Sequence, residues 1–368
     1  MNKLADLRER GVKLQERLFS TGLMDDEVPE FFADPVDTVS YGAGYPITGL
    51  EKFLGYFDDV LNIANFPSIS VTTDFSMAMS ACRYDKKPGK DRVIFDGREE
   101  GAFLRKASKA LEIFKSRYGI TGSYTFFIKR YRRYGEAKGL GESAAVASAV
   151  SRSLVASTFG KEALQEVSLV SRLARLVSGS GTRSVAGGLS LWLSYPYMKE
   201  EYCYGSQINQ DLSSLCFSAI PMKSEWVTDS AHKLARSSLF YEQWAVDKFN
   251  HIFTELDGGF NLEEILQRST EDMYLLNSII LSSGNFIHTP SSLAIIAKLK
   301  EFTAKNEGLY YTSDTGPTLV LMSKSPSLIR QFLDENSIEN HIDGKSYRIA
   351  PECSEEFKKV SSDTILAR

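Results

Sequence analysis

Three short stretches combine glycine with residues that can hold an anion. The first, GLGESAA from Gly139 to Ala145, lies between a strand pattern and a run of small residues typical of a helix. Backbone N–H groups at such a helix start can face a phosphate or carboxylate. The same letters also fit a tight strand-to-helix turn with Glu142 in the first helical turn. Because the Lys-Ser/Thr ending of a Walker loop is missing, a P-loop NTPase is disfavoured.

The second stretch, SGSGTRSVAGG from Ser178 to Gly188, follows a helix pattern and contains one long side chain, Arg183. An arginine in such open, glycine-rich surroundings can bind a phosphate or carboxylate through two N–H groups. A flexible turn with a solvated arginine is the alternative. The density of Ser and Gly directly after a helix favours the anion site.

The third stretch, TSDTGPT from Thr312 to Thr318, lies between two apolar strand patterns and places Asp314 at a strand end. An aspartate in this position can face a reacting centre. An ordinary turn with an Asx hydrogen bond explains the same letters. A single Asp-Thr-Gly copy argues against an aspartic protease.

The surrounding elements predict an α+β chain with two lobes. We expect strands over 38–48, 66–83, 92–95, 122–134, 189–195 and 309–323, and helices over 1–20, 101–119, 143–160, 161–177, 237–256, 261–282 and 291–306. The first helix is amphipathic and should pack on the body of the protein or on a partner rather than on a membrane. Strands mixed with helices, without a regular β-α-β period, favour α+β over a doubly wound sheet. We predict a helical extension over 1–35, an N-terminal lobe over 36–195 and a C-terminal lobe over 196–368.

Composition narrows the class of protein. The hydrophobic fraction of 43% and the charged fraction of 24% are ordinary for a soluble globular protein. No apolar run reaches the length of a membrane span, and the first residues lack the apolar core of a signal peptide, so we expect a cytoplasmic protein without membrane contact. A net charge of −4 argues against general nucleic-acid binding. Four scattered cysteines and four isolated histidines predict neither a metal site nor a disulfide scaffold.

Taken together, these stretches resemble the GHMP kinase superfamily and its diphosphomevalonate decarboxylase branch. SRLARLVSGSGTRSVAGGLSLW is similar to the family's helix, SGSACRSLxGG and strand, and DTGP is similar to DAGPN. GLGESAA takes the place of GLASSAA, FDGREE resembles LNGREE, and EKFLGY resembles IKYWGK. The five matches keep the family's order between residue 38 and about residue 320. The resemblance implies a ribosomal-protein-S5-like N-terminal lobe and a ferredoxin-like C-terminal lobe, with the site between them.

The resemblance also implies roles for individual residues. Arg183 matches the substrate-anchoring arginine, Asp314 matches the catalytic aspartate beside C3 of mevalonate, and Lys52 matches the lysine that begins the KYWGK segment. Further substrate contacts are expected from a hydroxyl cluster and from aromatic and basic positions, namely Ser178, Ser180, Ser184, Tyr56, Arg98 and Arg132. Because side chains alternate along a strand, only one subset of the basic run Lys129, Arg130, Arg132, Arg133 and Lys138 should face the cleft.

Two departures from the family pattern sharpen the prediction. Tyr56 replaces the second lysine of KYWGK, and Glu142 stands where the ATP phosphate loop carries serine. A carboxylate about 4 Å from a phosphate charge costs roughly 4 kcal/mol at an effective dielectric constant of about 20, or about a thousandfold in affinity. We therefore predict a degenerate nucleotide loop at Gly139, Gly141, Glu142 and Ser143, with the protein's own anion in the place of the triphosphate. A harmless cap, with ATP bound slightly displaced, is the alternative.

Loss of ATP binding with retention of Asp314 points to the archaeal bisphosphomevalonate decarboxylases. The resemblance then implies ATP-independent decarboxylation of mevalonate 3,5-bisphosphate to isopentenyl phosphate, CO2 and phosphate, without a cofactor. The alternatives are an ATP-dependent phosphomevalonate or diphosphomevalonate decarboxylase and a non-catalytic GHMP-fold sensor or scaffold. Related enzymes make a homodimer the expected assembly.

Overall fold

The computed structural model describes residues 3–99, 102–135, 137, 139–224 and 228–367. The chain begins with α1 (Lys3–Ser20), which packs against α7 (Tyr241–Asp257). Leu7, Leu14 and Leu18 are buried at this contact, and Arg17 pairs with Asp257. The apolar spacing of the first helix therefore predicted its packing on the body correctly. An irregular segment over 21–39 follows.

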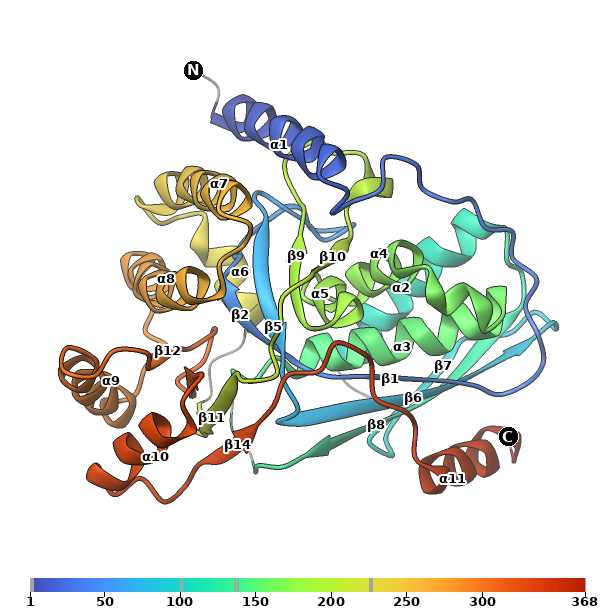
Figure 1. Ribbon diagram of the computed structural model, residues 1–368. Coiled ribbons are helices and arrows are strands. Elements are labelled where there is room, and N and C mark those ends of the chain that lie inside the picture. Colours follow the sequence, from blue (N-terminus) through green and yellow to red (C-terminus); the bar gives the residue numbers. More distant parts are fainter. Residues whose placement is uncertain (1–2, 100–101, 136, 138, 225–227, 368) are drawn as a thin grey trace.

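The first sheet has four strands in the order β1-β6-β8-β7. Its strands are β1 (Ser40–Gly44), β6 (Ser76–Asp85), β8 (Ser123–Arg132) and β7 (Arg92–Phe95). α3 (Glu142–Phe159) covers one face and α11 (Glu355–Leu366) covers the other (Figure 1). Phe126 and Ile128 pack on the α3 side, whereas Phe127 packs with Phe357 of α11, because successive side chains of β8 alternate between the faces.

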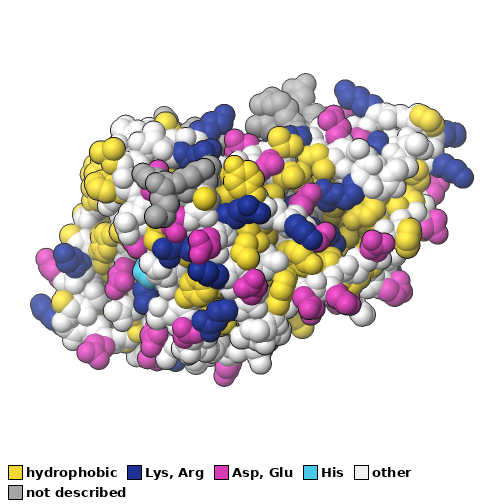
Figure 2. All heavy atoms as spheres, turned by 90° about the horizontal axis from the view of Figure 1, so that it is seen from above, with side chains coloured by type: hydrophobic (Ala, Val, Ile, Leu, Met, Phe, Trp, Pro, Cys, Tyr) yellow, Lys and Arg dark blue, Asp and Glu magenta, His cyan; other side chains and the backbone are white. Residues whose placement is uncertain are grey.

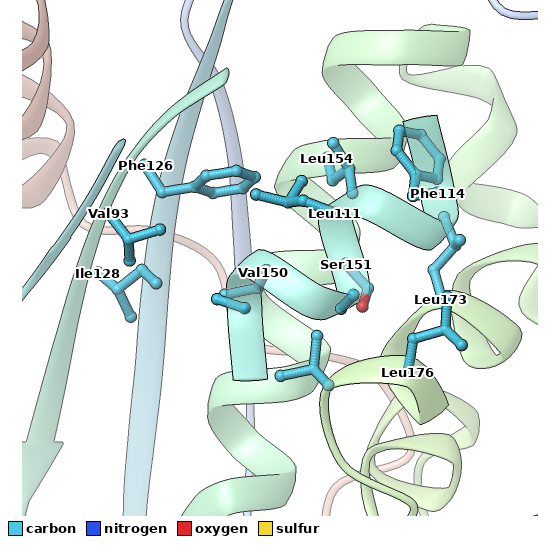
Figure 3. Close-up of a pocket in the computed structure, with 13 residues that line it drawn as sticks. Val93, Leu111, Phe114, Phe126, Ile128, Val150, Ser151, Leu154, Leu173 and Leu176 are labelled. Atoms are coloured by element: carbon cyan, nitrogen blue, oxygen red, sulfur yellow. The ribbon is translucent and has the colours of Figure 1, made fainter. Parts of the chain in front are cut away.

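The layer behind the first sheet is a closely packed core. α2 (Ala102–Tyr118) and α4 (Val167–Val177) join α3 there. A cavity of about 20 Å³ remains between them, with Leu111, Phe126 and Leu173 pointing into it (Figure 3). The hydroxyl of Ser151 in its wall donates to Ala147 O of its own helix at 2.8 Å. The cavity is thus an apolar packing void rather than a site for chemistry.

The second sheet has the order β10-β9-β5-β2 and is antiparallel throughout. Its strands are β10 (Gly205–Ile208), β9 (Leu189–Trp192), β5 (Ser68–Thr72) and β2 (Ile47–Glu51). The predicted lobe boundary at residue 195 therefore falls between two paired strands, β9 and β10. A short ribbon of β3 (Tyr56–Asp58) and β4 (Ile63–Ala64) follows β2 in the chain.

The third sheet has the order β12-β13-β11-β14. Its strands are β12 (Tyr310–Thr312), β13 (Leu319–Ser323), β11 (Cys216–Ile220) and β14 (Ile342–Gly344). The accompanying helices are α6 (Thr228–Ala235), α8 (Leu262–Ser282), α9 (Pro290–Thr303) and α10 (Pro326–Glu335). α8 contacts both β2 and β12, so it joins the second sheet to the third. The α+β prediction is confirmed.

Four predicted elements differ from the structure. The strand expected over 38–48 is divided into β1 and β2, and the strand expected over 66–83 is divided into β5 and β6; in both cases the two parts belong to different sheets. The helix expected over 161–177 is a 3-10 turn, Glu162–Gln165, followed by α4, with non-helical Glu166 between them. The glycine-rich turn expected over 178–188 contains a helix, α5 (Gly181–Ala186). Low helix propensity of Gly and Ser suggested a turn, but all six residues of α5 are buried, and packing outweighs propensity.

Charges of both signs lie on the face of the molecule that is seen from above (Figure 2). In the view from above, basic and acidic side chains are interspersed between apolar ones (Figure 2). Across the described residues, no helix is both long enough and apolar enough to cross a bilayer. All four cysteines are free thiols, two of them buried.

Candidate active site

Lys52 and Asp314 form an ion pair between β2 and the turn that joins β12 to β13. Lys52 Nζ lies 3.2 Å from Asp314 Oδ1 and donates to Gly49 O at 2.6 Å. Gly49 N approaches Asp314 Oδ2 at 3.4 Å, and a Cβ on Gly49 would lie 2.7 Å from Asp314 Oδ1. The Lys52 side chain is 3% exposed and that of Asp314 is 25% exposed. The lysine is therefore anchored inside while the carboxylate remains accessible.

Arg183 is a buried cation on α5. The residue is only 2% exposed, and its Cζ lies 5.3 Å from the centre of the Phe53 ring. Burial lowers the pKa of Arg183 to about 10, although the nearby charge of Asp314 opposes this shift. Its Nε and Nη1 are buried without a hydrogen-bond partner in the described part of the chain. The expectation of open surroundings was wrong. A buried, incompletely paired guanidinium is costly unless an anion completes its hydrogen bonds.

The hydroxyl cluster lies beside Arg183, but its members differ. Ser178 Oγ and Ser180 Oγ are 3.0 Å apart, and both residues are partly exposed. Ser184 is buried and donates to Tyr45 O at 2.6 Å. The hydrogen of the Ser184 hydroxyl is thus used to hold α5, whereas the first two serines can turn toward a ligand.

Tyr56 extends from β3 over the segment that carries these serines. A Cβ on Gly179 would lie 2.9 Å from Tyr56 Oη, so only glycine permits this approach. The Tyr56 ring stacks on His232 of α6 at 4.6 Å with an interplanar angle of 21°. His232 Nδ1 accepts from Gly55 N at 3.1 Å, which fixes the ring. Sequence reasoning missed His232 as a neighbour of this group, because an isolated histidine carries no motif.

Arg98 is not brought into this group. It is an exposed residue in the turn after β7, the edge strand of the first sheet, where Phe95 and Arg98 exchange two backbone hydrogen bonds. No hydrogen bond or ion pair joins Arg98 to Lys52, Arg183 or Asp314 among the contacts of the described residues.

The loop before α3 lies against the turn that holds Asp314. Gly139 has φ +92°, and a Cβ there would lie 3.2 Å from Gly316 Cα. Gly141 has φ +66°, and its Cβ would lie 2.2 Å from Ile47 O. Both positions require glycine for conformation and for space. Ser143, in the first turn of α3, is exposed.

Glu142, the first residue of α3, is held by three side chains of β8 and its end. Arg132 Nη2 donates to Glu142 Oε2 at 2.7 Å, Arg130 Nη1 lies 3.2 Å from the same oxygen, and Tyr134 Oη lies 2.8 Å from Oε1. Burial would raise the pKa of Glu142, but the hydrogen bonds from Arg132 and Tyr134 and the charge of Arg130 outweigh it and lower that pKa. Residues 130, 132 and 134 therefore lie on one face of β8 and its end, as strand alternation requires, whereas Lys138 of the same basic run lies outside the described residues.

A buried network of ion pairs lies next to Lys52 and contacts its backbone. Lys248 Nζ of α7 lies 2.5 Å from both Glu51 Oε2 and Asp272 Oδ2, and all three side chains are 0–2% exposed. Asp272 also accepts from Lys52 N at 2.7 Å and from Trp244 Nε1 at 2.7 Å. The carboxylate of Asp272 on α8 therefore fixes the backbone of Lys52. Sequence reasoning missed this network, because nothing in the helix patterns of α7 and α8 marks these positions.

The network separates the protonation states of two glutamates. Burial favours the neutral form of Glu51, but the charge of Lys248 and the contact with His251 lower its pKa to about 2. Burial, together with the negative charge of Glu51, raises the pKa of Glu255 to about 9. Glu255 thus holds a proton at neutral pH. Within the described residues no group of three or more His, Cys, Asp or Glu side chains can hold a metal ion.

Solved structures identify the fold. Mevalonate diphosphate decarboxylase from Staphylococcus aureus superposes with a TM-score of 0.75 at 20% identity, covering 88% of this chain and all of that chain. Mevalonate-3-kinase from Thermoplasma acidophilum superposes with a TM-score of 0.69 at 16% identity, covering 84% of this chain and 97% of that chain. The protein therefore has the two-lobed α+β fold of the GHMP kinases and mevalonate decarboxylases.

Sequence comparison narrows the class further. The diphosphomevalonate decarboxylase-like N-terminal domain family matches residues 44–201. The mevalonate 3,5-bisphosphate decarboxylase of Thermoplasma acidophilum is 42% identical over 94% of this chain and 86% of its own length. That of Thermoplasma volcanium is 40% identical over 92% of this chain and 91% of its own length. The chain belongs to the mevalonate 3,5-bisphosphate decarboxylase family.

Proposed function

We propose that the protein catalyses ATP-independent decarboxylation of mevalonate 3,5-bisphosphate to isopentenyl phosphate, CO2 and phosphate. The names of the two relatives, both mevalonate 3,5-bisphosphate decarboxylases, support the substrate and the loss of CO2. The observation that carries independence from ATP is the ion-pair cluster at Glu142, which fills the loop with an anion of the protein. Lys52, Arg183 and Asp314 remain together beside this loop and supply the groups for fragmentation.

The reaction needs heterolysis of two bonds. The C3–O bond breaks and its electron pair leaves with the 3-phosphate, so positive charge develops on C3. The C1–C2 bond then breaks, its electron pair forms the C2–C3 double bond, and CO2 departs. Because the 3-oxygen already carries phosphate, neither a phosphoryl donor nor a general base for a hydroxyl is required.

Asp314 is proposed to stabilise the developing cation. A fixed carboxylate near C3 interacts more strongly with the transition state than with the anionic substrate, which is the condition for acceleration. Lys52 holds Asp314 Oδ1 at 3.2 Å and is itself fixed by Gly49 O, so the carboxylate does not have to reorganise during the reaction. The positive charge of Lys52 also reduces the electrostatic repulsion between the Asp314 carboxylate and the anionic substrate.

Arg183 is proposed to anchor the carboxylate or the 3-phosphate of the substrate. Its Nε and Nη1 are buried donors without a partner among the described residues, and a substrate anion that completes the hydrogen bonds of the guanidinium fixes the orientation of the reacting bonds. Ser178, Ser180 and Tyr56 surround the same region and are proposed to bind the remaining oxygens. Arg132, which we expected to contact substrate phosphate, pairs with Glu142.

ATP binding would require displacement of an existing anion. Arg130, Arg132 and Tyr134 donate to the Glu142 carboxylate in the loop that resembles the ATP phosphate loop of the GHMP kinases. A triphosphate there would meet an ionised Glu142 and lose its cationic partners at the same time.

The test is a nucleotide-free turnover assay. Purified protein is incubated with mevalonate 3,5-bisphosphate in the presence of apyrase, and CO2 and orthophosphate are measured. We expect equimolar release of both. Release only from mevalonate 5-phosphate or 5-diphosphate with added ATP would instead establish the ATP-dependent decarboxylase, and absence of turnover from every substrate would establish a non-catalytic scaffold.

We also propose that the protein acts in the cytoplasm as a homodimer. Four free cysteines suit a reducing compartment. Leu281 and Phe286 at the end of α8 are 58% and 55% exposed, and Leu239 is 90% exposed nearby, since Ser238 contacts Ser282 at 2.6 Å. These side chains offer an apolar surface to a second copy. Sedimentation velocity of the wild type and of Leu281→Lys tests this assembly, and a monomeric wild type would refute it.

A further inference from the structure

A large second cavity lies beside α5, the helix that carries Arg183. Its volume is about 660 Å³, within the range of small-molecule sites. The walls come from β1, α3, α5 and the segment 348–353 that leads to α11. Val185 and Ala186 of α5 are part of the lining, so this cavity and the candidate active site share one helix.

Arg152 is an unbalanced cation in the wall of this cavity. Its Nη2 donates to Val185 O at 3.0 Å, but its Nε is buried without a hydrogen-bond partner in the described part of the protein. Burial lowers the pKa of Arg152 to about 10, and no carboxylate opposes that shift. A guanidinium that lacks a counter-ion in buried surroundings is stabilised by any anion that reaches it.

The rest of the lining is amphipathic. Arg348 and Lys358 also line the cavity together with one acidic residue, Glu352, but Lys358 Nζ is already paired with Glu355 Oε1 at 2.6 Å, so Arg348 is the cation that adds to Arg152. Arg348 donates to neutral partners only, Gln207 Oε1 at 3.0 Å and Asn209 Oδ1 at 3.0 Å, so its charge is not neutralised by these bonds. Apolar side chains form the remaining wall: Leu164, Val167, Val185, Ala186, Ile349 and Pro351.

We propose that this cavity binds a monophosphate ester of a short aliphatic alcohol, with the phosphate on Arg152 and the chain on the apolar wall. The cations select the anionic head group, and the apolar wall adds affinity for the chain that inorganic phosphate lacks. Isopentenyl phosphate, the product proposed above, belongs to this class. The inference depends only on the lining residues and holds independently of the proposed function.

Cys353 provides a readout that is specific for the cavity. It lines the cavity, with Sγ 3.3 Å from Gly42 O, whereas Cys216 lies outside it and is similarly part-exposed. We suggest alkylation with iodoacetamide, quantified for each cysteine peptide by mass spectrometry, with n-butyl phosphate, inorganic phosphate or n-butanol added. Butyl phosphate should slow alkylation of Cys353 without affecting Cys216. Phosphate should need about tenfold higher concentration, and butanol should have no effect.

Two variants test whether the protection of Cys353 from alkylation depends on the cations that line the cavity. Arg152→Gln keeps an N–H donor for Val185 O but removes the charge, and should raise the half-protecting concentration about tenfold or more. Arg83→Gln, a charge removal on β6 beside Asp37, is the matched control and should leave protection unchanged. If Arg152→Gln does not fold, exposed Arg348→Gln should weaken protection instead.

Four results would overturn the proposal. The first three are absence of protection in the wild type at millimolar butyl phosphate, equal protection by butanol, and protection that persists in both folded charge-removal variants. Equal protection by phosphate and butyl phosphate would also overturn it, because the apolar wall would then contribute nothing.

Discussion

The proposed reaction centre and the loop at Glu142 hold similar residues, but their charges are balanced in different ways. At the centre, one carboxylate, Asp314, faces Lys52 and the incompletely paired Arg183. At the loop, the carboxylate of Glu142 already receives hydrogen bonds from Arg130, Arg132 and Tyr134. Arg183 has buried donors that lack a partner among the described residues, so a ligand anion can complete its hydrogen bonds. Arg130, Arg132 and Tyr134 already donate to a carboxylate of the protein, so they are not available to a ligand anion.

The largest expected effect tests the centre. Asp314→Asn should lower kcat about 10²–10³-fold with little change in KM, because the charge that stabilises the cation is removed while the anion contacts remain. Steady-state kinetics on mevalonate 3,5-bisphosphate measure both. Asp343→Asn, at a side chain that is 60% exposed, is the control. An unchanged kcat in Asp314→Asn would remove this residue from the mechanism.

The second test concerns the network behind the centre. Asp272→Asn should lower the free energy of unfolding by about 3 kcal/mol, because Lys248 loses one of two buried counter-charges. Chemical denaturation measures this change. Glu263→Gln breaks the exposed pair with Lys324 and should cost less than about 1 kcal/mol. Equal effects of the two substitutions would show that the buried network contributes no more than a surface ion pair.

Local sequence patterns predicted the loop at Glu142 better than the proposed reaction centre. Strand geometry predicts that alternate basic residues of β8 share one face, and the letter Glu142 predicts an anion in the loop. In the structure these basic residues contact Glu142. Arg183 was expected in an open turn, yet packing buries it. Lys248, Asp272 and His232 come from distant helices whose letters carry no motif, so only tertiary structure places them beside Lys52 and Tyr56.

The third test uses pH. The pKa of Glu255 is raised to about 9 by burial and by the charge of Glu51, from 4.5 in the unfolded chain. Its contribution to stability is therefore complete below the unfolded pKa and is lost as pH rises through the folded pKa. Glu255→Gln removes this dependence. Relative to the wild type, the variant should gain up to about 1.4 kcal/mol in unfolding free energy per pH unit from pH 6 to pH 8. Parallel stability curves would contradict the assignment.

The smallest expected effect is that of a substitution at Glu142, which tests the role of the loop. Glu142→Ser should lower the free energy of unfolding by about 1 kcal/mol, because the carboxylate is partly exposed and its ion pairs are screened. Nucleotide-free turnover should stay close to the wild-type value, since Glu142 touches no proposed reacting group. Calorimetry should detect binding of a non-hydrolysable ATP analogue to the variant but not to the wild type, because Arg130 and Arg132 become available. Binding of equal strength to both proteins would show that Glu142 does not exclude the nucleotide, and the contrast between the two regions would then lie only in the reaction centre.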